Sequence, residues 1–273
     1  MVPLILWKIV VFVFGMCVGS FLNVCIYRIP KRKSIVFPAS HCPKCKTPIK
    51  WYHNIPVLSY LFLKGRCAFC GKKISVCYPL VETISAIFAL MCFNKFFVGQ
   101  GDLALAFIFY AFLCALIVIT GIDLKYFIIP DIISISGIIM GIIFSFIFPQ
   151  IHHTANHLHA LWLSVLSCLI ASGTLFLIAV IGSVIFKKEA MGLGDVKLVG
   201  LFGAFLGYKY ALLSIFLSSI IGSIFGIGMI LFGKAKLQTR IPFGPYLAAG
   251  AFLSLFYGDI LIDWYIRLLT MGL

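Results

Sequence analysis

The chain has 273 residues, of which 62% are hydrophobic and only 11% are charged. Soluble domains carry about 25% charged residues, so this composition excludes an ordinary water-soluble fold. The formal net charge of +14 is typical of the basic excess on the cytoplasmic side of membrane proteins, and nucleic acid is therefore not an expected partner.

Continuous apolar runs of about 20 residues recur along the chain, which is the length a helix needs to cross a bilayer. The runs do not alternate between apolar and polar residues, as transmembrane strands would. We therefore predict an all-α polytopic membrane protein with about eight transmembrane helices and one small soluble insert. Its three parts would be a first transmembrane helix at 1–28, a cytoplasmic insert at 29–77 and a transmembrane domain at 78–273.

The first expected span runs from Leu4 to Ile26 and has no signal-peptide cleavage site. We therefore interpret it as a transmembrane helix that is not removed as a signal peptide. Gly15 and Gly19 give one face of this helix small residues, which lets another helix approach closely. Ser20 and Asn23 share a helix face, and either interhelical hydrogen bonding or contact with a substrate backbone would suit them. A basic cluster then predicts that this end is cytoplasmic. It consists of Arg28, Lys31, Arg32 and Lys33.

Two Cys-x-x-Cys pairs dominate the expected insert. Cys42 and Cys45 form the first pair, and Cys67 and Cys70 form the second after a loop of about 20 residues, a spacing that matches a four-thiolate zinc ribbon. We therefore predict a structural zinc ion held by these four cysteines. A redox pair is the weaker alternative, because one pair would suffice for it and no βαβ pattern surrounds either.

Other potential ligands lie near these pairs and in a later loop. His41, His53 and Cys77 are alternative zinc ligands at the insert. The later loop contains four histidines, but no carboxylate or cysteine completes a metal site there, so an ordinary polar loop is favoured. These histidines are His152, His153, His157 and His159.

Acidic residues at the edges of apolar runs are the candidates for catalysis. Glu82 lies just inside the second span, where an ionisable side chain is a functional candidate, although pairing with a basic residue explains it equally well. Asp123 ends the third span. Asp131 begins the fourth and reads as a helix-start carboxylate. Asp195 lies in the sequence Gly-Leu-Gly-Asp-Val-Lys, at the start of another apolar run.

We predict that Asp123 and Asp195 meet at the cytoplasmic membrane edge and activate a water molecule between them. Two neighbouring carboxylates share a proton. The helix dipole predicts that Asp195, at a helix N-terminus, is ionised and that Asp123, at a C-terminus, holds the proton. Gly192 and Gly194 would allow close backbone approach or loop movement. The alternative is that Asp195 only caps its helix and forms a salt bridge with Lys197.

The remaining apolar runs complete the expected bundle. Gly200, Gly203 and Gly207 predict a close-packing face on a short sixth span. A separate seventh span is expected from about Tyr210 to Phe232. The sequence Pro-Phe-Gly-Pro at 242–245 then breaks the backbone before the last span.

Taken together, these motifs resemble the bacterial prepilin leader peptidases, the intramembrane aspartic enzymes of type IV pilus and type II secretion systems. The resemblance covers nearly the whole chain. Beyond the two cysteine pairs and the Gly-Leu-Gly-Asp-Val-Lys stretch, it rests on Gly19-Ser20-Phe21-Leu22-Asn23-Val24, Trp51-Tyr52-His53-Asn54-Ile55-Pro56, Tyr78-Pro79-Leu80-Val81-Glu82, Asp123-Leu124 with Pro130-Asp131, and Ile241-Pro242-Phe243-Gly244-Pro245-Tyr246.

The resemblance implies cleavage of the basic leader of prepilins or pseudopilins after a glycine, followed by N-methylation of the new N-terminus with S-adenosylmethionine. It implies that Asp123 and Asp195 are catalytic and that the four cysteines bind zinc. Supporting site candidates are Gly192, Gly194, Lys197 and Glu82. The expected location is the bacterial inner membrane, in contact with lipids, with the site and the insert facing the cytoplasm. The rivals are another Gly-x-Gly-Asp intramembrane protease and a non-enzymatic transporter or membrane scaffold.

Overall fold

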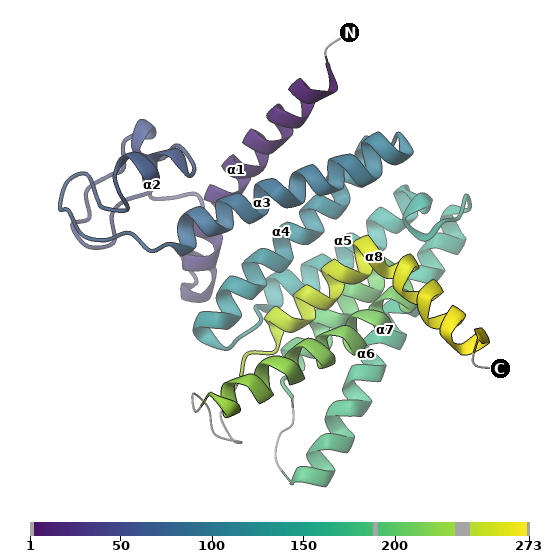
Figure 1. Cartoon of the computed structure of the whole chain (residues 1–273). Coiled ribbons are helices and arrows are strands. Elements are labelled where there is room, and N and C mark those ends of the chain that lie inside the picture. The colour runs from purple at the N-terminus through teal and green to yellow at the C-terminus, as the bar shows by residue number, and fades with distance from the viewer. Residues whose placement is uncertain (1–2, 188–190, 233–240, 272–273) are drawn as a thin grey trace. The chain divides into compact units, whose positions relative to one another are not determined.

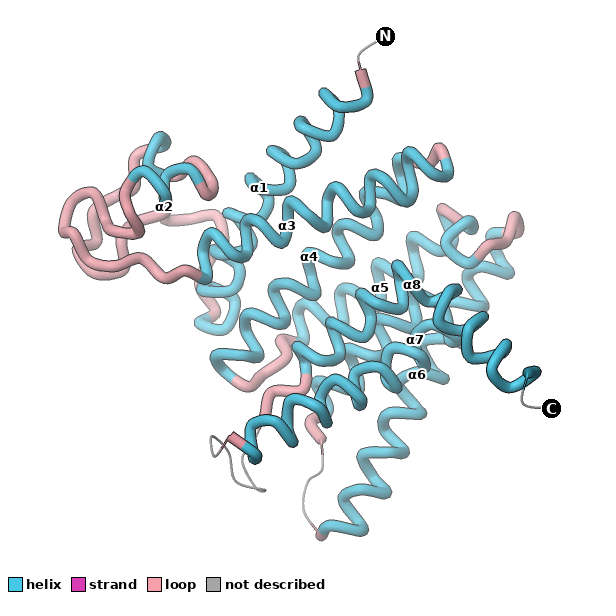
Figure 2. The backbone as a smooth tube through the Cα atoms, viewed as in Figure 1, coloured by secondary structure: helices cyan, strands magenta, loops and turns pink. Residues whose placement is uncertain are grey.

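A computed structural model of the protein describes residues 3–187, 191–232 and 241–271. Within these ranges the protein is built from eight α-helices without any strand, which confirms the predicted all-α class (Figures 1 and 2). The helices are α1 (Leu4–Arg28), α2 (Leu58–Phe62), α3 (Cys77–Cys92), α4 (Leu103–Tyr126), α5 (Asp131–Ile147), α6 (His157–Phe186), α7 (Leu193–Leu231) and α8 (Gly244–Met271).

Six of the described helices are long and apolar enough to cross a membrane, and α5 is only slightly shorter at 17 residues. The predicted sixth and seventh spans are the two parts of α7, which are separated at Gly207. Gly207 interrupts this helix with a non-helical backbone of φ 81° and ψ 162°. A glycine adopts this positive φ without a steric penalty, so the first segment can end here, and Tyr208-Lys209-Tyr210 begins the second.

The chain divides into two compact units, Met1–Ile122 and Asp123–Leu273, so that the last turn of α4 belongs to the second. In the first unit, α1 packs along α3. A Cβ atom on Gly15 would lie 2.6 Å from the Cα of Ala86, and one on Gly19 would lie 2.6 Å from the Cα of Glu82. The prediction that these glycines allow close helix packing is therefore confirmed.

Buried polar groups join α1 to α3 and join the insert to both helices. The side-chain amide of Asn23 donates a hydrogen bond to the carbonyl oxygen of Tyr78 at 3.1 Å, which fits the interhelical interpretation of its position. The backbone N–H of Val57, in the insert, donates to Oε2 of the buried Glu82 at 2.7 Å. Arg28 is also buried, and its guanidinium donates to two carbonyl oxygens of the following loop. The insert is thus joined to the helices by hydrogen bonds to groups shielded from water.

In the second unit, α7 packs against α5, α6 and α8, and its first half forms the core. Every residue from Leu198 to Leu206 is buried. Gly203 lies directly against the backbone of Ser167 in α6, where any Cβ atom would overlap the Ser167 carbonyl group. The predicted close-packing role is confirmed for Gly203, whereas Gly207 breaks the helix.

Substitution of Gly203 by alanine should therefore destabilise the protein. The added methyl group would push α7 away from a backbone atom that cannot rotate aside, and such overpacking typically costs about 1–3 kcal/mol. We expect a clearly lower thermal unfolding temperature of the purified protein in detergent. The matched control is Gly173→Ala in α6, because a Cβ atom there meets nothing within 4 Å. An equal loss in both variants would contradict the packing role of Gly203.

Candidate active site and metal site

Asp195 lies in the first turn of α7, as the sequence predicted. Its backbone N–H donates to the carbonyl oxygen of Gly192, the N-cap residue, at 3.1 Å. A Cβ atom on Gly194 would lie 3.0 Å from the Cβ of Ile129, in the loop between α4 and α5. Gly194 therefore lets this loop and the first turn of α7 come into close contact, which fixes the position of the Asp195 backbone.

Asp123 lies in the last turn of α4 and is only 5% exposed. The backbone N–H of Gly244, at the start of α8, donates to its Oδ2 at 2.9 Å. A Cβ atom on Gly244 would lie 2.7 Å from the same oxygen, so a larger residue would displace the carboxylate. The sequence around Gly244 predicts only a backbone break, so this role was missed, although the position of the glycine between two prolines was a usable signal.

The structure brings the two predicted aspartates together within the second unit. Asp123 and Asp195 are close enough for their charges to interact. The end of α4, the start of α7 and the start of α8 therefore converge on one pair of carboxyl groups. Such a pair can share a proton and perform general acid and base chemistry on a water molecule. Which of the two carries the proton stays a prediction.

Lys197 does not form a salt bridge with Asp195. The alternative interpretation, in which Asp195 caps its helix and pairs with Lys197, is therefore wrong in its second part. The ammonium nitrogen of Lys197 instead contacts Oδ1 of Asp131, the first residue of α5, at 2.7 Å. The side chain of Lys197 is 37% exposed and that of Asp131 is 59% exposed. The predicted helix-start position of Asp131 is confirmed. Lys197 therefore joins the starts of α5 and α7.

The four predicted cysteine ligands form a cluster in the first unit. The sulfur atoms of Cys42, Cys45, Cys67 and Cys70 all lie within 4.8 Å of one another, and those of Cys42 and Cys70 are 4.0 Å apart. Four sulfurs arranged tetrahedrally at about 2.3 Å from zinc would lie about 3.8 Å apart. The cluster therefore fits a four-thiolate metal site.

The two cysteine pairs are folded in the same way. In each pair the N–H of the first cysteine donates to a carbonyl oxygen five residues later, that of Thr47 in one and Lys72 in the other. Lys46 and Gly71, four residues after the first cysteine, both have a positive φ. Hydrogen bonds from Thr47 lower the pKa of the Cys45 thiol to about 6, which favours the thiolate that a metal requires.

The other histidine and cysteine candidates lie outside this cluster. His41 contacts the backbone carbonyl of Ala39, and Cys77 begins α3. His53 also lies outside the group of four sulfurs. In the described part of the chain, the four cysteines are the group that could hold a metal ion.

The histidine loop is held by local hydrogen bonds. Nε2 of His152 lies 3.0 Å from the hydroxyl of Ser145, and burial lowers the pKa of His152 to about 4. His157 contacts the carbonyl oxygen of Phe146 at 2.6 Å. The rings therefore connect α5 with the segment that follows. The predicted loop is shorter than expected, because His157 and His159 lie in the first turn of α6.

A polytopic helical membrane protein that pairs two aspartates at helix ends has the site expected of an intramembrane aspartic peptidase. Comparison with known families gives a more specific result. Residues 110–227 match the Type IV leader peptidase family, and residues 13–96 match the Bacterial Peptidase A24 N-terminal domain. With the similarities to individual proteins below, these matches show that the chain belongs to the type IV leader peptidase family.

Three similar proteins are each named "Prepilin leader peptidase/N-methyltransferase". That of Legionella pneumophila is 34% identical, over 94% of this chain and 94% of its own length. That of Aeromonas salmonicida is 33% identical, over 94% of this chain and 92% of its own. That of Bacillus subtilis is 33% identical, over 95% of this chain and 98% of its own. No solved structure matches the chain.

Proposed function

We propose that this protein is a prepilin leader peptidase, which cleaves the basic leader of type IV prepilins or pseudopilins after a glycine. Membership of the type IV leader peptidase family supports this function, as do relatives of nearly equal length that carry this name. The observation that carries the proposal is the convergence of Asp123 and Asp195 on one site. Neither a transporter nor a scaffold would require this pairing.

The proposed reaction is hydrolysis by a water molecule held between the two aspartates. The ionised carboxylate removes a proton from the water, whose oxygen attacks the carbonyl carbon of the scissile peptide bond. The protonated carboxyl group donates a hydrogen bond to the carbonyl oxygen and stabilises the charge that develops there. The C–N bond then breaks, and the leaving amine takes up a proton. The Gly244 N–H holds the Asp123 side chain in place throughout.

The positions of the aspartates suit a substrate with a basic leader and an apolar helix. Asp123 lies at the end of α4 and Asp195 at the start of α7, both of which are long enough to span the bilayer. The carboxylates therefore belong at the edge of the apolar layer, where the leader of such a substrate meets its membrane segment. We propose the cytoplasmic face of the inner membrane, because basic residues follow α1 directly.

We also propose that the insert at 29–77 holds a structural zinc ion. All four cysteines would be ligands, which leaves no open position for a substrate or a reactive water. The bound zinc would hold the two cysteine turns together. Nearby basic side chains would offset the negative charge of four thiolates on one zinc ion. They are Lys44, Lys46, Lys72 and Lys73.

N-methylation of the new N-terminus is the second part of the proposed function, and it rests on the names of the relatives. S-adenosylmethionine would supply the methyl group. The described part of the chain has no strand followed by a glycine-rich loop and a helix. It therefore lacks the unit with which dinucleotide-binding folds hold a nucleotide, and this donor would need another kind of site.

The test uses the purified full-length protein in detergent with a synthetic prepilin peptide. Mass spectrometry should show loss of the leader after its terminal glycine. With S-adenosylmethionine added, the product should gain the mass of one methyl group. An intact substrate after prolonged incubation would contradict the peptidase function. Cleavage without methylation would support the first activity and contradict the second.

A further inference from the structure

The insert exposes large apolar side chains in the segment 51–62, which includes α2. They belong to Trp51, Ile55, Leu58, Leu61 and Phe62. The side chains of Trp51 and Phe62 are 81% and 82% exposed, whereas the one buried residue of α2 is a serine. This polarity is the reverse of that in a soluble domain, where large apolar side chains are buried. A contiguous exposed apolar surface of this kind marks a site of contact with a partner or a membrane.

A buried hydrogen bond sets the level of this segment along α1 and α3. The N–H of Val57, directly before α2, donates to Oε2 of Glu82 at 2.7 Å. Glu82 lies five residues after Cys77, the first residue of α3, which is about 7.5 Å along the helix. It contacts Gly19 of α1, after which that helix continues to Arg28, about 13 Å further on.

Both α1 and α3 are long and apolar enough to cross a membrane. The hydrogen bond at Glu82 therefore lies within the apolar stretch of both helices, and α2 begins beside this stretch rather than beyond its end. Figure 1 shows α2 at the level of the start of α3, with the other loops of the insert extending further out. The exposed apolar segment is thus held at the depth where lipid begins.

The backbone of the segment suits a layer that is poor in water. The N–H of Ser59 donates to the carbonyl oxygen of Ile55 at 3.0 Å, and that of Leu61 donates to the carbonyl oxygen of Val57 at 3.1 Å. The hydroxyl of Ser59 donates to the carbonyl oxygen of Tyr52, so this polar group faces inward and is satisfied. Lipid tolerates a peptide segment only when its backbone polar groups are paired in this way.

We propose that residues 51–62 form a lipid anchor, in which Trp51, Leu61 and Phe62 lie in the interfacial layer of the membrane that α1 and α3 cross. Apolar side chains are stabilised by leaving water, and tryptophan is enriched at this layer. The exposed Lys50 and Lys64 flank the anchor, and their long side chains would reach the phosphate groups of the lipids. The partner is therefore the phospholipid surface, which the depth of the segment and the flanking charges both fit.

The cysteine cluster would support this anchor from the side of the cytoplasm. Phe69 lies between Cys67 and Cys70, and its ring centroid is 6.0 Å from that of His53, within the anchor. A metal that orders this cysteine turn would therefore also order the segment that contacts lipid. The insert would be fixed to the membrane surface by the anchor as well as by its connections to α1 and α3.

The test measures the fluorescence of Trp51 in the full-length protein, reconstituted into vesicles of phosphatidylcholine and phosphatidylglycerol. The chain has four tryptophans, so the Trp51 signal is the difference between wild type and Trp51→Phe. Lipids brominated on the acyl chain near the headgroup quench interfacial indoles, and iodide in the buffer quenches indoles in water. Brominated lipid should lower the Trp51 signal by at least about half, and iodide should lower it by less than about one tenth, because an interfacial indole lies against the acyl chains.

The matched control is Trp162→Phe, because Trp162 is an exposed tryptophan of the membrane-crossing helix α6. Its signal should also be quenched by brominated lipid, which shows that the lipid reaches exposed indoles. If iodide quenches Trp51 and brominated lipid does not, the segment lies in water and the inference is overturned. Resistance of Trp51 to both quenchers would show that protein covers it, as in an association of two copies of the chain, and would also overturn the lipid anchor.

A crosslinking measurement tests the other end of the segment. Photoreactive benzoylphenylalanine would replace Phe62 in one variant and Lys44, an exposed residue between Cys42 and Cys45, in the other. After irradiation in vesicles, mass spectrometry should find phospholipid attached at position 62 and little or none at position 44. Adducts only to protein at position 62, or equal amounts of lipid at both positions, would contradict the anchor.

Discussion

Asp123→Asn and Asp195→Asn should each abolish prepilin cleavage, with a loss of at least about 10³-fold in kcat. Asparagine has nearly the same shape as aspartate, but it can neither take a proton from water nor share one with its neighbour. Each variant therefore removes the acid and base chemistry while it leaves the packing of α4 and α7 intact. Initial rates of cleavage of a synthetic prepilin in detergent provide the measurement.

The control for both variants is Asp263→Asn, the same substitution at an exposed position of α8. It should retain cleavage within about 3-fold of wild type, in line with the small effect of most surface substitutions. Yield and thermal unfolding temperature should be close to wild type in all three variants. Substantial cleavage by either the Asp123 or the Asp195 variant would show that the pair does not perform the hydrolysis.

Replacement of a single zinc ligand, as in Cys42→Ser or Cys70→Ser, should remove zinc and unfold the insert. Few residues of the insert are buried, and they supply little apolar core: across 29–77 they are Cys42, Ser59 and Gly65. Such a segment depends on its metal, and structural zinc contributes about 10–16 kcal/mol of apparent binding free energy in comparable peptides. Metal analysis should find about one zinc per wild-type chain and close to none in the variants.

Cys77→Ser provides the matched control, because this exposed cysteine lies only seven residues after Cys70 and outside the cluster. It should keep its zinc. Limited proteolysis should cut the insert rapidly in the ligand variants and slowly in the control. Full zinc content in Cys70→Ser, or its loss from Cys77→Ser, would refute the proposed ligand set.

The helices and the cysteine cluster could be predicted from the sequence because their signals are local. An apolar run of about 20 residues must satisfy its own backbone hydrogen bonds in lipid, so it forms a helix whatever it packs against. The spacing of two cysteines within each pair likewise sets a turn that can surround one metal. The placement of Asp123 and Asp195 at helix ends followed from the same runs.

The meeting of Asp123 and Asp195 could be predicted because both aspartates were expected at the same membrane edge, but other contacts between distant segments could not. Gly244 binds Asp123 across 121 residues of sequence, and no periodic pattern connects the two. Lys197 had a carboxylate two residues away and nevertheless pairs with Asp131, because the starts of α5 and α7 meet only in the folded unit. The two spans on either side of Gly207 were predicted, but the break at this residue was not, since a glycine within an apolar run is equally compatible with close packing and with a backbone break.

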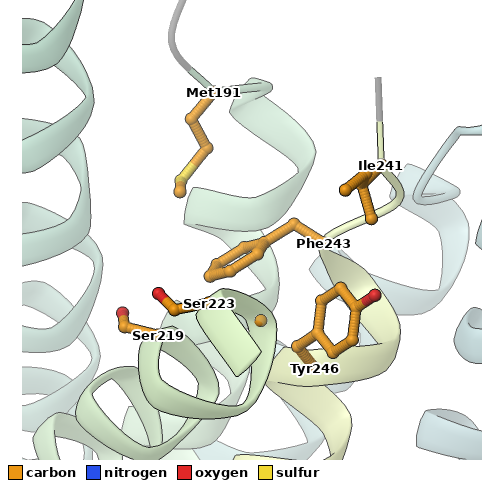
Figure 3. A pocket seen from close by; sticks show the side chains of 7 residues that line it. Met191, Ser219, Ser223, Ile241, Phe243 and Tyr246 are labelled. Atoms are coloured by element: carbon orange, nitrogen blue, oxygen red, sulfur yellow. The ribbon is translucent and has the colours of Figure 1, made fainter. Parts of the chain in front are cut away.

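The interruption at Gly207 also determines where the second part of α7 lies. The segment before it carries Asp195 and is buried from Leu198 to Leu206. Met191 and Gly222 line one pocket (Figure 3) although 31 residues separate them, so the chain reverses direction at Gly207 and the later segment returns to the end that carries Asp195. A continuous helix through this position would instead carry the later segment about 1.5 Å further from Asp195 with each residue.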